Sequence, residues 1–414
     1  MPVSAKRAGL AAAATATLAL MLGVAGAGAA SGTGTVDRTL DPGTRFYVPG
    51  FEPAAHRQWA QLVSSGARRD ADLIRELESV SHGVWVTGGT ASATKHDVQL
   101  TTVLATAKRE VPVLVAYNIP GRDCGGFSAG GAQTTADYKA WIDAFAEGLG
   151  DRKAVVIVEP DGLGLLPSNC GGPNASYPFT DDERYTELNY AVDRLEQQPG
   201  ALVYLDGTHS HWLGVGDAAR RLVTAGVQRA QGFFVNVSNY QPTERLAKYG
   251  TWISECIAFA NNPEEGGWRL GHYDWCASQY YPANVDDFST WHLSDEWYAA
   301  NLGHAVPTTH FVVDTSRNGR GAWQPTASYP DAQDWCNPPG RGLGLRPTAD
   351  TGVALADAYL WVKVPGESDG SCTRGLGRAG ATVDPEWGIV DPAAGDWFPE
   401  QALQLARLAS PSLP

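Results

Sequence analysis

The segment Ala154-Val-Val-Ile-Val-Glu-Pro-Asp161 decides the fold of this chain. It opens with an unbroken apolar run rich in β-branched side chains, a pattern typical of a strand buried on both faces of a parallel sheet. The run ends directly in Glu159-Pro160-Asp161. The segment therefore predicts a buried parallel strand that carries acidic groups at its carboxyl end.

Other short apolar runs along the chain follow the same pattern. They cover residues 111–117, 201–206, 232–237, 310–314 and 358–364. Amphipathic stretches that predict helices separate them, most clearly at residues 137–149 and 182–197. Alternation of buried strands with helices predicts an α/β fold built on a parallel sheet or barrel.

Polar side chains follow nearly every one of these runs. They are Asn118, Arg122 and Asp123, Glu159 and Asp161, Asp206 and His209, Asn236 and Asn239, Asp314 and Arg317, and Lys363, Glu367 and Asp369. One Asp after a strand is more often a helix N-cap than a functional group. Because the carboxyl ends of parallel barrel strands open onto one face, the repetition predicts a shared cleft lined by carboxylates.

Composition limits the partners of this cleft. The chain has 414 residues and a formal net charge of −14, which disfavours nucleic acids and other anionic polymers and is compatible with a neutral substrate. No cofactor motif is present, so we expect no cofactor. Neither a linker nor a low-complexity break divides residues 46–414, which predicts one large domain.

The N-terminus has the pattern of a secretory signal peptide. Lys6 and Arg7 precede an apolar stretch at residues 11–24 and a run of small residues at 25–31. We predict a signal peptide over residues 1–30, a short polar lead over 31–45, and a secreted, extracellular mature protein with no membrane partner. A retained anchor is the alternative, although the stretch is short and Ala-rich.

Six cysteines, an even number in an exported chain, predict three disulfides. They are Cys124, Cys170, Cys256, Cys276, Cys336 and Cys372. Their positions alone leave the connectivity open. Their spacing does not match that of metal ligands, so we expect no metal.

Several acids combined with many aromatic rings fit glycoside hydrolysis. In that reaction one carboxylic acid protonates the leaving oxygen, and a second carboxylate activates water or attacks as nucleophile.

A serine hydrolase is a rival, since G-x-S-x-G occurs at residues 126–130 and 366–370. However, Ser368 has no His after it, and Ser128 lies in a Gly-rich loop past its strand. The G-x-G-x-x-G at residues 375–380 does not follow a strand, and no Walker A sequence is present, which disfavours nucleotide binding.

The residues at the strand ends resemble glycoside hydrolase family 6, which contains secreted cellulases. The resemblance rests on Tyr117-Asn-Ile-Pro-Gly-Arg-Asp-Cys124, Val158-Glu-Pro-Asp161, Tyr204-Leu-Asp-Gly-Thr-His209, Asn236-Val-Ser-Asn-Tyr240, Asp314-Thr-Ser-Arg-Asn-Gly319 and Trp361-Val-Lys-Val-Pro-Gly-Glu-Ser-Asp-Gly370. It implies a distorted parallel β/α barrel of about seven strands with long loops over its C-terminal face. It also implies inverting hydrolysis of β-1,4-glucosidic bonds in cellulose or cello-oligosaccharides, by a monomer.

Catalytic roles carry over from this resemblance. Asp161 matches the general acid, whose task requires a raised pKa. Asp123 matches the acid beside it, Asp369 the proposed base, and Asp206 a further carboxylate in the cleft. Because all four acids are present, a non-catalytic glucan-binding protein is the weaker alternative. Inversion requires acid and base roughly 6.5–9.5 Å apart.

Substrate-binding roles carry over in the same way. Trp85, Trp212 and Trp335 match sugar-stacking rings, although core packing is the usual role of a lone Trp. The matching polar or near-reaction positions are Tyr117, His209, Asn239, Lys363 and Glu367. Arg122 is expected to hold the local carboxylates, and Asp314 with Arg317 is expected to form a structural ion pair.

The resemblance also implies the disulfides Cys124–Cys170 and Cys336–Cys372, which leaves Cys256 to pair with Cys276.

Long segments at residues 240–310 and 375–396 look closer to bacterial exo-enzymes, in which long loops cover the cleft. We therefore expect a cellobiohydrolase that acts from non-reducing chain ends, with an open-cleft endoglucanase as the alternative. Val215 replaces a Trp found at the tunnel entrance of some exo-enzymes, and Ala129 a Ser that orients water.

Overall fold

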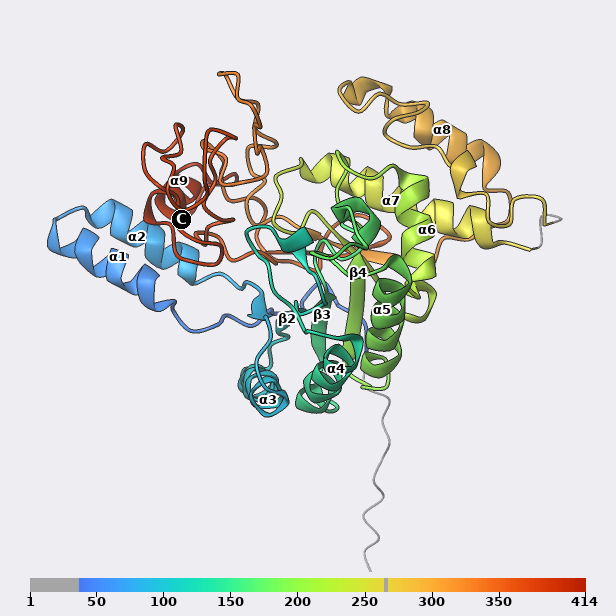
Figure 1. The fold of residues 1–414 in the computed structure, drawn as a ribbon, viewed down its shortest axis with the longest axis horizontal. Coiled ribbons are helices and arrows are strands. Elements are labelled where there is room, and N and C mark those ends of the chain that lie inside the picture. The colour runs from blue at the N-terminus through green and yellow to red at the C-terminus, as the bar shows by residue number, and fades with distance from the viewer. Residues whose placement is uncertain (1–36, 264–266) are drawn as a thin grey trace, which may run out of the picture. The chain divides into compact units, whose positions relative to one another are not determined.

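The computed structural model describes residues 37–263 and 267–414, shown in colour in Figure 1. The predicted signal peptide lies outside the described residues. Among the helices that are described, none combines the length and the apolar character needed to cross a membrane.

Within the described residues, seven strands form one parallel sheet, hydrogen-bonded in sequence order. They are β1 (Val84–Val86), β2 (Val113–Ala116), β3 (Ala154–Val158), β4 (Ala201–Asp206), β5 (Gly232–Val235), β6 (His310–Asp314) and β7 (Ala356–Leu360). The distorted parallel barrel is confirmed. The apolar runs predicted six of these strands, and β1 was missed because three residues are too short for a periodic pattern.

Helices follow most strands (Figure 1). The α-helices are α1 (Pro53–Ser64), α2 (Arg68–Glu78), α3 (Ala91–Lys108), α4 (Thr135–Leu149), α5 (Asp181–Leu195), α6 (Val215–Thr224), α7 (Thr243–Asn261), α8 (His292–Asn301) and α9 (Pro399–Arg407). Short 3-10 turns are η1 (Asp123–Gly125), η2 (Pro167–Cys170), η3 (Val227–Arg229), η4 (Tyr273–Trp275) and η5 (Phe288–Thr290). The two predicted helices are α4 and α5, and a capping box of Thr180 and Glu183 fixes the start of α5.

Each central strand is buried on both faces, which explains its unbroken apolar run. On β3, Val155 and Ile157 join the cluster inside the barrel, whereas Val156 and Val158 join the cluster shared with the helices. Successive side chains of a strand point to opposite faces, so both faces require apolar residues when both are covered.

Hydrogen bonds outside the strand ladders join the two edges of the sheet. The backbone N–H of Gly83, just before β1, donates to the Trp361 carbonyl just after β7 at 2.8 Å. The Trp85 indole N–H donates to the Val362 carbonyl at 2.9 Å. A Cβ at Gly83 would lie 2.4 Å from the Val362 oxygen, so only glycine permits this approach. Because of this contact, the residues that follow β1 and β7 lie beside the same cavity.

The three disulfides pair as expected, Cys124–Cys170, Cys256–Cys276 and Cys336–Cys372. The first joins the loops after β2 and β3, and the third joins the loops after β6 and β7. Two of the three bonds therefore tie together segments at the carboxyl ends of neighbouring strands.

The closure at Gly83 predicts a specific sensitivity. Gly83→Ala should lower the free energy of unfolding by about 2 kcal/mol, because the new methyl group overlaps the Val362 carbonyl. Denaturant unfolding of this variant and of a control variant measures the loss of stability. Gly50→Ala is the matched control, since a Cβ at Gly50 meets no atom within 4 Å. Equal stability of the two variants would contradict the closure.

Candidate active site

A cavity of about 860 Å³ lies at the carboxyl ends of the strands. All the predicted catalytic and substrate-binding residues except Asp206 line it. They are Trp85, Tyr117, Arg122, Asp123, Asp161, His209, Trp212, Asn239, Trp335, Lys363, Glu367 and Asp369. The fold thus brings together side chains that are far apart in the sequence.

The backbone turns sharply where it leaves the strands. Asp123, Glu159, Asp161, Asn236 and Ser238 adopt φ between +51° and +71°, which is costly for residues with a side chain. These strained positions lie after β2, β3 and β5. Such strain persists only where the surroundings hold it in place, and here it accompanies the residues that line or support the cavity.

Asp161 differs from the neighbouring carboxylates in its hydrogen bonding. Among the described residues, no donor bonds to its side-chain oxygens. Burial, followed by the negative charges of Asp206, Asp123 and Asp369, raises its pKa well above the ordinary range. The raised pKa favours the protonated form of Asp161 at the wall of the cavity, which is the form a general acid requires.

Asp206 lies behind the cavity wall rather than in the cleft as expected. Its carboxylate accepts backbone N–H bonds from Leu163, Gly164 and Thr208 at 2.9–3.2 Å. These amides enclose the carboxylate, so no substrate can reach it. Asp206 acts on the site indirectly, since it fixes the turn after Asp161 and its charge raises the Asp161 pKa.

Asp123 lies in the loop after β2. Its Oδ2 accepts the Ser128 N–H at 2.6 Å, and burial raises its pKa. Among the described residues, Arg122 makes no hydrogen bond to a carboxylate. Instead it donates to the backbone carbonyls of Ser128, Tyr117 and Thr87. Arg122 therefore fixes the loop that carries Asp123.

Asp369 is the most strongly bonded acid of the cavity. Both of its oxygens accept from the Arg317 guanidinium at 2.9 Å, and Oδ2 also accepts from the Tyr240 hydroxyl at 3.1 Å. The expected Asp314–Arg317 ion pair is wrong. Asp314 instead accepts backbone N–H groups, including those of Ser238 and Lys363, so Arg317 is available to Asp369.

Asn337, which the sequence analysis missed, fixes the backbone around Asp369. Its N–H donates to Asp369 Oδ2 at 2.9 Å, and its side-chain oxygen accepts the Asp369 N–H at 2.8 Å. Its amide nitrogen donates to Asp391 Oδ2 at 2.9 Å. The only clue in the sequence was its position directly after Cys336.

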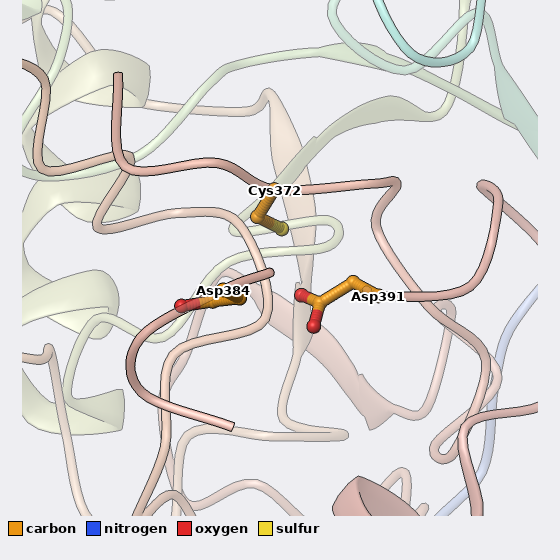
Figure 2. A group of neighbouring side chains, drawn as sticks. All are labelled: Cys372, Asp384 and Asp391. Atoms are coloured by element: carbon orange, nitrogen blue, oxygen red, sulfur yellow. The ribbon is translucent and has the colours of Figure 1, made fainter. Parts of the chain in front are cut away.

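Behind Asn337 lies a buried group made of Cys372, Asp384 and Asp391 (Figure 2). Its composition resembles a metal site, but the Cys372 sulfur is bonded to Cys336 and Asp384 pairs with Arg374 at 2.7 Å. Burial, with Asp384 nearby, raises the pKa of Asp391 to about 7. The group supports the Asn337 loop through the Asp391 carboxylate and offers no thiolate to a metal.

The remaining predicted residues supply rings and uncharged or paired polar groups. Trp85 meets Tyr117 edge-on, and Trp212 lies beside His209. Burial lowers the pKa of His209 to about 3, so its ring is neutral. The Lys363 Nζ lies 3.8 Å from Glu367 Oε2, so the two side chains form an ion pair. Rings beside hydroxyl-binding groups suit an uncharged ligand with apolar faces.

A model of glycosyl hydrolases family 6 matches residues 41–409. This chain belongs to that family. Endoglucanase A of Cellulomonas fimi is 34% identical over 370 residues, which are 89% of this chain and 62% of that protein. A probable 1,4-beta-D-glucan cellobiohydrolase C of Aspergillus niger is 32% identical over 321 residues, 72% of this chain and 61% of the relative.

A solved family 6 structure has the same fold. The endoglucanase Cel6 of Mycobacterium tuberculosis, in complex with a thio-linked cellobioside, superposes with a TM-score of 0.64 at 33% identity. The match covers 90% of this chain and all of that one. The chain spans less than two thirds of the length of the Cellulomonas and Aspergillus relatives.

The pKa of Asp161 predicts how activity depends on pH in this family 6 site. Activity that needs protonated Asp161 persists below its raised pKa and is lost as the pH rises through it. Asp123→Asn removes one of the charges that raise this pKa. The alkaline limb of kcat/KM should therefore move to lower pH, as a pH–rate profile would measure. An unmoved limb would contradict the assigned coupling.

Proposed function

We propose that this family 6 protein is an inverting glycoside hydrolase that cleaves β-1,4-glucosidic bonds in cellulose and cello-oligosaccharides. The main support is the contrast between Asp161, whose pKa is raised and whose side chain accepts no hydrogen bond from the described residues, and the ion-paired Asp369. The names of the relatives, endoglucanase and cellobiohydrolase, agree with this substrate.

The proposed reaction uses the two acids in different states. Asp161 donates its proton to the oxygen of the leaving sugar. Asp369 lies in the loop after β7 and accepts a proton from the attacking water, directly or through a second water. Arg317 and the Asn337 N–H hold the Asp369 carboxylate in place. Asp123 lies beside Asp161 and keeps the acid protonated before the bond breaks.

We further propose exo action that releases cellobiose from non-reducing ends. The loops after β2 and β6 meet at the cavity: the centroid of the Phe127 ring lies 5.9 Å from that of the Trp335 ring, and both residues line the cavity. Phe127 also lies so close to Gly370 that a Cβ there would be 2.5 Å from it. We propose that these loops cover the cleft, which would favour entry by a chain end.

Endo action is the second candidate. Two of the relatives described above carry the name endoglucanase, and one of them matches over its full length. Val215, where some exo-enzymes have an exposed Trp, begins α6 and is fully buried. That position therefore contributes no ring to a chain entrance.

We also propose that the protein is secreted and monomeric. The three disulfides support an oxidising compartment, because such bonds persist mainly outside the cytosol.

Timed product analysis on cellohexaose tests the activity and the mode together. Mainly cellobiose with α configuration at the new end is expected. A spread that includes cellotriose and cellotetraose would indicate endo action. Retained β configuration or no cleavage would contradict the proposed reaction.

Asp161→Asn tests the acid. Turnover of cello-oligosaccharides should fall about a thousandfold, because proton donation is lost while side-chain volume is kept. Calorimetry should show that cello-oligosaccharide binding persists. Near-normal turnover in this variant would rule out Asp161 as the acid.

A further inference from the structure

Two adjacent tyrosines lie exposed on the turn at residues 278–282, between η4 and α8. Tyr280 is 45% exposed and Tyr281 is 80% exposed. Within residues 37–263 and 267–414, the Tyr281 ring stacks on no other aromatic ring and its hydroxyl has no hydrogen-bond partner. So large an exposed ring suggests a surface that meets a ligand.

The turn that carries these rings is rigid. The Ser278 N–H donates to the Tyr281 carbonyl at 2.7 Å, and the Ser294 hydroxyl donates to the Ser278 carbonyl at 2.8 Å. The buried Gln279 amide donates to the Leu213 carbonyl at 2.9 Å. Cys276, two residues before the turn, is tied to Cys256 of α7. An exposed ring on a fixed turn loses little conformational entropy when it binds.

The turn is seated on the loop that carries Trp212. The Tyr280 hydroxyl donates to the Trp212 carbonyl at 2.9 Å. Its ring also lies over Gly214, where a Cβ would be 3.7 Å away. Trp212 itself lines the cavity. Tyr280 therefore joins the turn to the loop of a cavity-lining ring, and Tyr281 follows it directly in the chain.

We propose that Tyr280 and Tyr281 form an additional binding surface for a single β-1,4-glucan chain, next to Trp212 and outside the cavity. This inference rests on the proposed glucan activity. The two rings suit the apolar faces of an uncharged sugar, and the Tyr281 hydroxyl can bond a sugar hydroxyl. The surface holds the part of a long chain that extends past the catalytic acids, so it matters only for long substrates.

A second exposed aromatic side chain lies between α7 and η4, but we do not assign it to the glucan-binding surface. Trp268, 59% exposed, packs on Phe259 and Trp275. It is not a lining residue of the cavity and therefore supplies an exposed aromatic control.

The experiment measures binding by calorimetry in the Asp161→Asn background, which prevents hydrolysis. Tyr281→Ala should weaken cellohexaose binding about fivefold and leave cellotriose binding unchanged. Tyr281→Phe keeps the ring and should restore most of the affinity. Trp268→Ala should change neither ligand. Because Tyr281 is exposed, thermal unfolding should be the same in the parent and the two Tyr281 variants.

Three results would overturn the proposal. Equal cellohexaose affinity in the parent and Tyr281→Ala would remove the binding surface while leaving the proposed activity intact. An equal loss for cellotriose and cellohexaose would place Tyr281 within the cavity. If the unmodified protein neither cleaves nor binds cellohexaose, the activity and the surface both fall.

Discussion

The site depends on how five or more carboxyl groups are buried at one end of a single sheet. A buried carboxylate is stable only with donors or a cation beside it. Asp206 and Asp314 receive backbone amides, and Asp369 receives Arg317. Asp161 accepts no hydrogen bond from the described residues, and the negative charges of its neighbours raise its pKa further. This difference from Asp206, Asp314 and Asp369 favours its protonated form.

Supplying those amides has a structural cost. The N–H groups that bond Asp206 and Glu159 come from chain segments just beyond the strands. To aim them inward, the backbone adopts left-handed turns at Glu159 and Asp161. The same turns end the strands and begin the loops. The same few residues thus end the strand, adopt the strained backbone and precede the amides that bond the carboxylates.

Much of this architecture could be predicted from local patterns. Apolar runs identify six strands because both faces are buried, and acids at their ends follow from barrel geometry. The partners of those acids could not be predicted. Arg317 lies three residues from Asp314 and 52 from Asp369, yet it pairs with Asp369. Asp314 had already been satisfied by backbone groups, which sequence patterns do not reveal. Asp206 was misplaced for the same reason.

The contact of Phe127 with Trp335 is a single tilted ring pair beside Gly370. A pair of this kind contributes about 1 kcal/mol. In the proposed enzyme, exo and endo action are then two competing rates, set by how often these loops separate. A chain threads through by its end while the loops touch, and it enters sideways while they are apart.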